Sequence, residues 1–211
     1  MSFDPITTTE LLDKLDKELN NTKEKIKVSC CGGLSIMMLT KGRSSINDID
    51  LIFDNEEQEN QVSLAAHKLF KKEPLINNED WINGDAKLNN FYNKSEEVVY
   101  NGKNIQINSI LPEELLLNVL VTPKNRQSIE DAKYLTLYLN KDNKESLLAT
   151  LINIDSSYNK KSHQKRALEE RLFAIWEYAY NEDKSEIPFV YPNSVLIEES
   201  FSQYKKRKNK P

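Results

Sequence analysis

The sequence contains few of the residues that build disulfide or zinc frameworks. Its 211 residues include two cysteines and two histidines. The cysteines, Cys30 and Cys31, are adjacent, and neighbouring cysteines rarely form a bridge, while two are too few to close a zinc site. We therefore expect both to be small, buried and reduced. His67 and His163 lie far apart in sequence, so each is expected on the surface of a helix rather than in a metal site.

The sequence also lacks a long hydrophobic segment and a strong excess of charge. No apolar run approaches the roughly 18 residues of a membrane span. The first residues, MSFDPITTTELLDKLDKEL, show no basic region followed by an apolar core, as a secretory signal would. We expect a cytoplasmic protein with no membrane contact. The net charge of -4 argues against nucleic-acid binding by the whole surface. The basic tail at 205–210 is typical of a solubilising segment, although an electrostatic contact with RNA remains open.

Apolar periodicity predicts a mixture of helices and strands. Helical spacing marks 11–21, 34–40, 56–73, 112–121, 129–140 and 165–180, whereas β-branched or alternating residues mark strands at 25–31 and 47–54. The order of these elements predicts an α+β fold, with a small mixed β-sheet flanked by helices and a helical C-terminal region. We expect one domain over 1–140 and a helical region with the basic tail over 141–211.

Three local signals refine this outline. Thr7 and Glu10 have the spacing of a capping box at the start of the first helix. Asn101-Gly102 between two alternating runs predicts a hairpin turn. The Asn-rich segment 75–95 is expected to be mostly loop.

Two aspartates in the strand 47–54 suggest a metal site. Asp48 and Asp50 are two residues apart, so both project from one face, while Ile49, Leu51 and Phe53 point into the core. Two neighbouring carboxylates repel each other unless a cation lies between them, and Mg²⁺ prefers such oxygen ligands. The alternative is a solvated strand face.

The residues before these aspartates are suited to binding phosphate. Gly32 and Gly33 lie between a strand and a helix, where the backbone can approach an anion at the helix N-terminus. The alternative for this pair is a tight strand–helix turn. The segment 41–45 then adds Arg43 and Ser45, a cation and a hydroxyl. Together with the aspartates, these residues predict a combined phosphate and metal site.

The pattern GG-x₁₄-D-x-D, within CCGGLSIMMLTKGRSSINDIDLIF, resembles the signature of the DNA polymerase β-type nucleotidyltransferase superfamily. It is most similar to minimal bacterial members, including abortive-infection toxins. A second segment, ILPEELLLNVLVTPKNRQSIEDAKYL, resembles a later helical element of the family. The resemblance implies that Asp48 and Asp50 bind Mg²⁺ and that Gly32 and Gly33 contact the triphosphate, helped by Arg43 or Ser45. An acceptor hydroxyl would then attack the α-phosphorus of the nucleotide.

The sequence departs from the family pattern at the third carboxylate. The matching strand, NIQINSI, offers the neutral residues Gln106 and Asn108, and the nearest acid is Asp85. Ser35 stands one position later than the family's small polar residue, and Ser128 replaces an acid after the arginine. These departures bear on catalytic turnover more than on the fold.

Three functional hypotheses follow. One is a Mg²⁺-dependent transferase that moves NMP from an NTP to RNA (such as tRNA) or protein, within a toxin–antitoxin or phage-defence pair with a cognate antitoxin as partner. Another is a catalytically degenerate module that binds a nucleotide or partner. The last is a plain α+β interaction protein with an acidic patch. Trp176, Tyr178 and Tyr180 fit either base stacking or helix packing.

Overall fold

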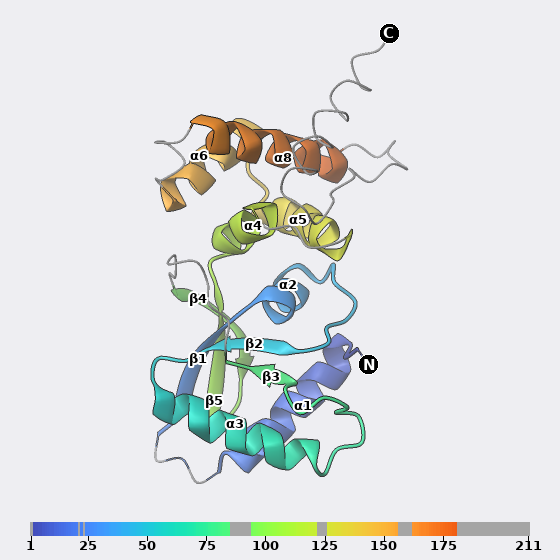
Figure 1. Cartoon of the computed structure of the whole chain (residues 1–211), viewed down its shortest axis with the longest axis vertical. Coiled ribbons are helices and arrows are strands. Elements are labelled where there is room, and N and C mark those ends of the chain that lie inside the picture. Colours follow the sequence, from blue (N-terminus) through green and yellow to red (C-terminus); the bar gives the residue numbers. More distant parts are fainter. Residues whose placement is uncertain are drawn as a thin grey trace. The chain divides into compact units, whose positions relative to one another are not determined.

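The computed structural model describes residues 2–20, 22, 24–84, 94–121, 126–155 and 162–180. Two units divide the chain at Leu111 and Pro112. The helices and strands are coloured along the chain in Figure 1. In the first unit they are α1 (Pro5–Glu18), β1 (Ile26–Cys31), α2 (Gly32–Thr40), β2 (Ile49–Ile52), α3 (Glu56–Phe70), β3 (Ile82–Asn83), β4 (Lys94–Asn101) and β5 (Ile105–Ile110). In the second they are α4 (Pro112–Val121), α5 (Arg126–Leu139), α6 (Lys144–Ile154) and α8 (Ser162–Tyr180).

The first unit is organised around a five-stranded mixed sheet with the strand order β3-β2-β1-β5-β4. β1 pairs in parallel with β5, and β2 pairs in parallel with β3. The β1–β2 and β4–β5 pairs are antiparallel. This sheet, the helices that flank it and the helical C-terminal region confirm the α+β fold expected from the sequence. The two-residue strand β3 was not expected, because its residues lie in the segment interpreted as loop.

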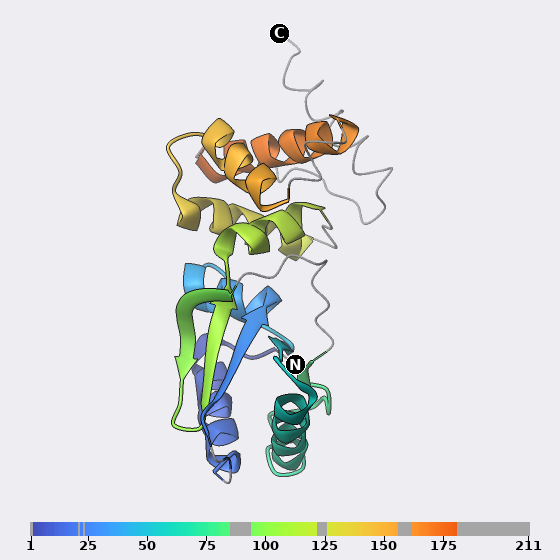
Figure 2. The same cartoon turned by 90° about the vertical axis from the view of Figure 1, so that its left-hand side faces the viewer.

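One face of the sheet forms the core of this unit. Val28, Cys30, Ile49, Leu51 and Ile107 alternate along their strands and are all buried. Leucines of α1 and the apolar face of α3 complete the same cluster. Figure 2 shows these two helices in the same part of the unit, away from α2. Burial of the alternate residues orients the strands, because a shift of one residue would expose every core side chain.

The first helix begins differently from the sequence prediction. Asp4 is the N-cap residue, and its carboxylate accepts a hydrogen bond from the Thr7 amide at 2.7 Å. The expected capping box of Thr7 and Glu10 is therefore wrong. Pro5 explains the earlier start, because its missing N–H and restricted φ suit the first helical position.

The hairpin between β4 and β5 is present, but its turn lies at Lys103 and Asn104 rather than at Asn101-Gly102. Asn101 pairs with Gln106, and the Gly102 amide donates to the Ile105 carbonyl at 2.9 Å.

A carboxylate from α1 accounts for this position of the turn. Asp16 accepts hydrogen bonds from the amides of Lys103, Asn104 and Ile105 at 3.1, 2.7 and 2.9 Å. A side chain at Gly102 would collide with the same carboxylate. The glycine is thus required for the close approach of Asp16, not for a left-handed turn conformation.

The second unit consists of packed helices. Leu116, Leu135, Leu151 and Leu172 come from α4, α5, α6 and α8 respectively, and all are fully buried. Arg171 in α8 donates to the Leu120 and Val121 carbonyls at the end of α4, at 3.0 and 3.2 Å.

The sequence placed the domain boundary after residue 140, whereas the units divide before Pro112. The reason is that α4 and α5 bury their apolar faces with α6 and α8. Among the described residues, no helix has the length and apolar character needed to cross a membrane.

Candidate functional site

The two adjacent glycines form the junction between β1 and α2. Cys31 is the N-cap residue in extended conformation, and Gly32 begins the helix with a φ of 63°. This left-handed φ is costly for a residue with a Cβ, so the junction requires glycine. Leu34 and Met37 of α2 then enter the core and hold the helix in place. The first amides of α2 are consequently presented beside the end of β1.

Asp50 lies directly against this junction. It is the cross-strand partner of Cys31, and its side chain is half-buried. A methyl carbon built at Gly32 would be only 2.8 Å from Asp50 Oδ2. The carboxylate therefore occupies space that opens only because residue 32 has no side chain.

Asp48 immediately precedes β2 and is exposed to solvent. Ile49 and Leu51 are fully buried, as the alternating pattern predicted. The same alternation places Asp48 on the side of Asp50, although the regular strand begins only at Ile49. The two aspartates thus differ in environment, one packed against a glycine and one open to water.

Arg43 lies against the second glycine. Its Cζ and Nη2 are 3.1 and 3.3 Å from the position that a Cβ on Gly33 would occupy. The arginine Nε donates to the Ser45 carbonyl at 3.0 Å, which holds the guanidinium in this place. The structure therefore places Asp50 and Arg43 against consecutive glycines. Ser45 contributes its carbonyl to this arrangement.

The loop carrying Arg43 is fixed at its far end. Ile46 is buried and forms an isolated bridge with Phe3, with hydrogen bonds of 2.6 and 2.9 Å between their backbones. This bridge limits the freedom of the short segment between α2 and β2. The backbone that carries Arg43 is therefore held by α2 before it and by the bridge after it.

Asn83 is a residue of this region that the sequence analysis missed. Parallel pairing of β2 and β3 sets Asn83 beside Asp50, and its Nδ2 lies 3.5 Å from Asp50 Oδ1. An asparagine in a two-residue strand carries no alternating pattern, so its proximity to Asp50 is visible only in the fold.

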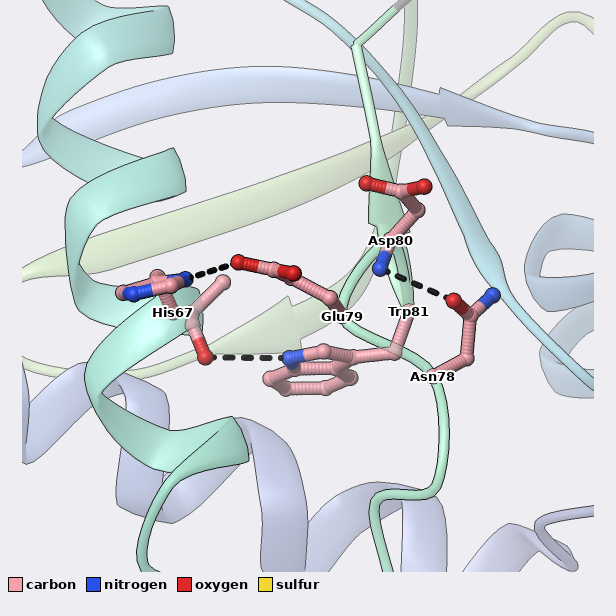
Figure 3. Close-up of polar contacts among 6 residues, drawn as sticks. His67, Asn78, Glu79, Asp80 and Trp81 are labelled. Atoms are coloured by element: carbon pink, nitrogen blue, oxygen red, sulfur yellow. Dashed lines mark hydrogen bonds and ion pairs between the residues drawn. The ribbon is translucent and has the colours of Figure 1, made fainter.

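The segment that leads into β3 is anchored on α3. The Trp81 indole N–H donates to the Ala66 carbonyl at 3.2 Å. His67 of α3 is paired with Glu79 of this segment (Figure 3). Trp81 is fully buried, and its own carbonyl accepts from the Ile49 amide at 2.8 Å. These contacts hold β3 in register beside β2. His67 therefore belongs to a helix surface, as expected, with a structural partner.

The strand expected to carry a third acid presents an amide pair instead. Gln106 Nε2 donates to Asn108 Oδ1 at 2.8 Å, so both side chains project from one face of β5. Asn108 is paired with Ser29 of β1, which in turn is paired with Ile52 of β2. Asp85, the other candidate acid, lies outside the described residues.

The donor set fits a hard divalent cation that keeps much of its water. Within the described ranges, no group of three or more His, Cys, Asp or Glu residues has a metal-binding arrangement. Mg²⁺ does not need such a cage, because it is usually held by one or two carboxylates together with water and substrate phosphates. Asp48 and Asp50 supply two carboxylates of this type.

No protein-family model, curated protein or solved structure matches this chain.

Cys30, next to the site in sequence, is not part of its chemistry. Its side chain lies in the core, and its sulfur is 2.9 Å from the Ser35 hydroxyl. Burial raises the pKa of the Cys30 thiol to about 12, and the negative charge of Asp50 acts in the same direction. A thiol with such a pKa is not a nucleophile at neutral pH. Neither cysteine is part of a disulfide, and both are buried, as expected.

The aromatic residues of α8 are engaged within the helical unit. Tyr178 donates to Glu130 at 2.6 Å, and Lys133 lies over its ring at 4.4 Å from the centroid. Trp176 and Tyr180 contact each other with centroids 4.5 Å apart. For Tyr178 these contacts favour helix packing over base stacking.

Proposed function

We propose that this protein is a Mg²⁺-dependent nucleotidyltransferase that transfers NMP from an NTP to a macromolecular acceptor, either RNA or protein. The observation that carries the proposal is that two oppositely charged side chains lie against two consecutive glycines. Asp50 lies against Gly32 and Arg43 lies against Gly33 at the N-terminus of α2. A guanidinium and helix amides attract phosphate, while the carboxylate attracts the cation that accompanies it.

Each residue has a defined part in this proposal. The amides at the start of α2 and the Arg43 guanidinium bind the triphosphate, and Asp48 and Asp50 hold the cation. When bound, Mg²⁺ neutralises charge that develops on the phosphate oxygens. The acceptor hydroxyl oxygen forms a bond to the α-phosphorus while the bond to pyrophosphate breaks, and the hydroxyl proton passes to water.

A specific observation favours a second candidate, a nucleotide-binding module without turnover. Gln106 and Asn108 are hydrogen-bonded to each other on the strand where a third acid was expected. A neutral amide can ligate a cation through its oxygen but cannot accept a proton as a general base. The module would bind a nucleotide with its cation and would transfer nothing.

Label transfer distinguishes these candidates. The full chain is incubated with each α-³²P-labelled NTP, Mg²⁺ and cellular RNA and protein, alongside Asp48→Ala/Asp50→Ala. Asp142→Ala/Glu145→Ala, which removes two exposed charges of the helical unit, serves as the matched control. We expect label with wild type and control, and none with the aspartate variant. Nucleotide binding without label would favour the module, and absence of both would contradict the proposed function.

A further inference from the structure

Asp50 is held between two neighbours, and its two oxygens face different groups. Oδ2 lies toward the space left by Gly32, where a methyl carbon would approach to 2.8 Å. Oδ1 lies 3.5 Å from the Asn83 amide. Asn83 is thus a side chain in hydrogen-bonding contact with the half-buried aspartate of the proposed cation site.

The distance between Asn83 and Asp50 suits two ligands of one cation. At 3.5 Å it is at the long limit of a hydrogen bond, so this contact contributes little attraction by itself. Two adjacent oxygens around an octahedral cation lie about 3.0 Å apart for metal–oxygen distances of roughly 2.1 Å. The amide can rotate to present its oxygen in place of its nitrogen, since the two ends are nearly isosteric.

The backbone under Asn83 is rigid enough to place a ligand. Ile82 and Trp81 are buried, and the Trp81 indole and carbonyl are both hydrogen-bonded, to Ala66 and Ile49. The pairing of Asp50 with Asn83 ends this short ladder. Ligands on packed strands are held more precisely than ligands on free loops.

We propose that Asn83 is a third oxygen ligand of the cation held by Asp48 and Asp50, contributed by β3 rather than by β5. This inference rests on the proposed function, because it assigns a role at the same site. It predicts a cation site built from two carboxylates and one amide, in which the amide replaces the acid expected on β5.

Mn²⁺ binding to the full chain, measured by electron paramagnetic resonance without nucleotide, tests the inference directly. Asn83→Asp adds a charged ligand beside Asp50, so we expect the Kd for Mn²⁺ to fall on the order of tenfold. Asn83→Leu removes the oxygen and should raise the Kd several-fold. In an Asp48→Ala/Asp50→Ala background, the gain from Asn83→Asp should disappear, because the added carboxylate then has no partner.

Asn101→Asp is the charge control. Asn101 lies on β4 of the same sheet, opposite Gln106, roughly 13 Å farther along the strands than the Asp50 row. Asn101→Asp adds the same charge away from the cation site. Its Kd for Mn²⁺ should therefore stay within about twofold of wild type. Circular dichroism of each variant checks that the fold is retained.

The outcomes separate this inference from the proposed function. Asp50-dependent Mn²⁺ binding that responds to Asn83→Asp no more than to Asn101→Asp would overturn the role of Asn83 and leave the proposed function standing. Tighter binding in Asn108→Asp but not in Asn83→Asp would assign the third ligand to β5 and also overturn the inference. Absence of Asp50-dependent binding in wild type would contradict both.

Discussion

The two faces of the sheet in the first unit use the same strands for opposite purposes. On the core face, Val28, Cys30 and Leu51 are buried among the side chains of α1 and α3. On the other face, Asp50, Asn83 and Asn108 present carboxylate and amide groups that water can reach. The adjacent cysteines illustrate the division, since Cys30 belongs to the core and Cys31 is the partner of Asp50. Apolar alternation on one face therefore positions the polar groups on the other.

The largest effect is expected on the free energy of unfolding, when two neighbouring residues on opposite faces of the sheet are truncated separately. Leu51→Ala removes a fully buried core side chain and should lower the free energy of unfolding by about 2–5 kcal/mol. Ile52→Ala removes a half-buried side chain of the other face and should cost about 1 kcal/mol. Urea denaturation of both variants measures the difference. Equal losses would show that the two faces are packed alike.

The reactivity of the Cys30 thiol tests how closed the core face is. The Cys31→Ser variant leaves Cys30 as the single thiol. Because burial raises the pKa of Cys30 to about 12, its thiolate fraction at pH 8 is roughly three orders of magnitude below that of an ordinary cysteine. We expect native protein to react with iodoacetamide at least that much more slowly than unfolded protein. Fast native alkylation would place Cys30 outside a closed core.

Substitution of the junction glycine tests the side of the sheet that carries Asp50. Gly32→Ala forces a Cβ into a left-handed conformation, at about 1–2 kcal/mol, and toward Asp50 Oδ2. We expect this loss of stability together with loss of label transfer. Gly42→Ala is the control, since Gly42 lacks a positive φ. Full activity in Gly32→Ala would contradict a ligand role for Asp50 in its present position.

The smallest effect is expected at the N-cap of α1, which covers the core face. The hydrogen bond from Thr7 lowers the pKa of Asp4 below 3.8, so its carboxylate stabilises the folded state above that pH and loses this contribution as pH falls through the folded pKa. Asp4→Asn keeps a good cap and removes the charge. Wild type should be slightly more stable at pH 7, and the gap should close below the folded pKa. A gap that persists in acid would assign the effect to something other than ionisation.

Much of the fold could be predicted because the strands alternate clearly. Ile49 and Leu51 are buried on either side of Asp50, and the apolar spacing of α1 and α3 matches the faces that they bury. The glycine pair also occurs where a strand meets a helix. These features depend on near neighbours in the chain, which is the information that a single sequence contains.

The remaining features depend on contacts between distant residues. Asn83 reaches Asp50 only through the pairing of β3 with β2, and the hairpin turn is placed by Asp16. The boundary before Pro112 reflects which helices share apolar faces. Local signals favoured Asn101-Gly102 as the turn, but three hydrogen bonds that backbone amides donate to a remote carboxylate outweigh that preference.

The hydrogen bonds that Asp16 accepts also bear on the order in which this unit forms. The three amides that donate to Asp16 lie 87, 88 and 89 residues farther along the chain. During synthesis, these hydrogen bonds can therefore form only after nearly the whole unit has emerged. A contact between residues so far apart in sequence is entropically costly to form and tends to form late. Its main effect is therefore to slow unfolding.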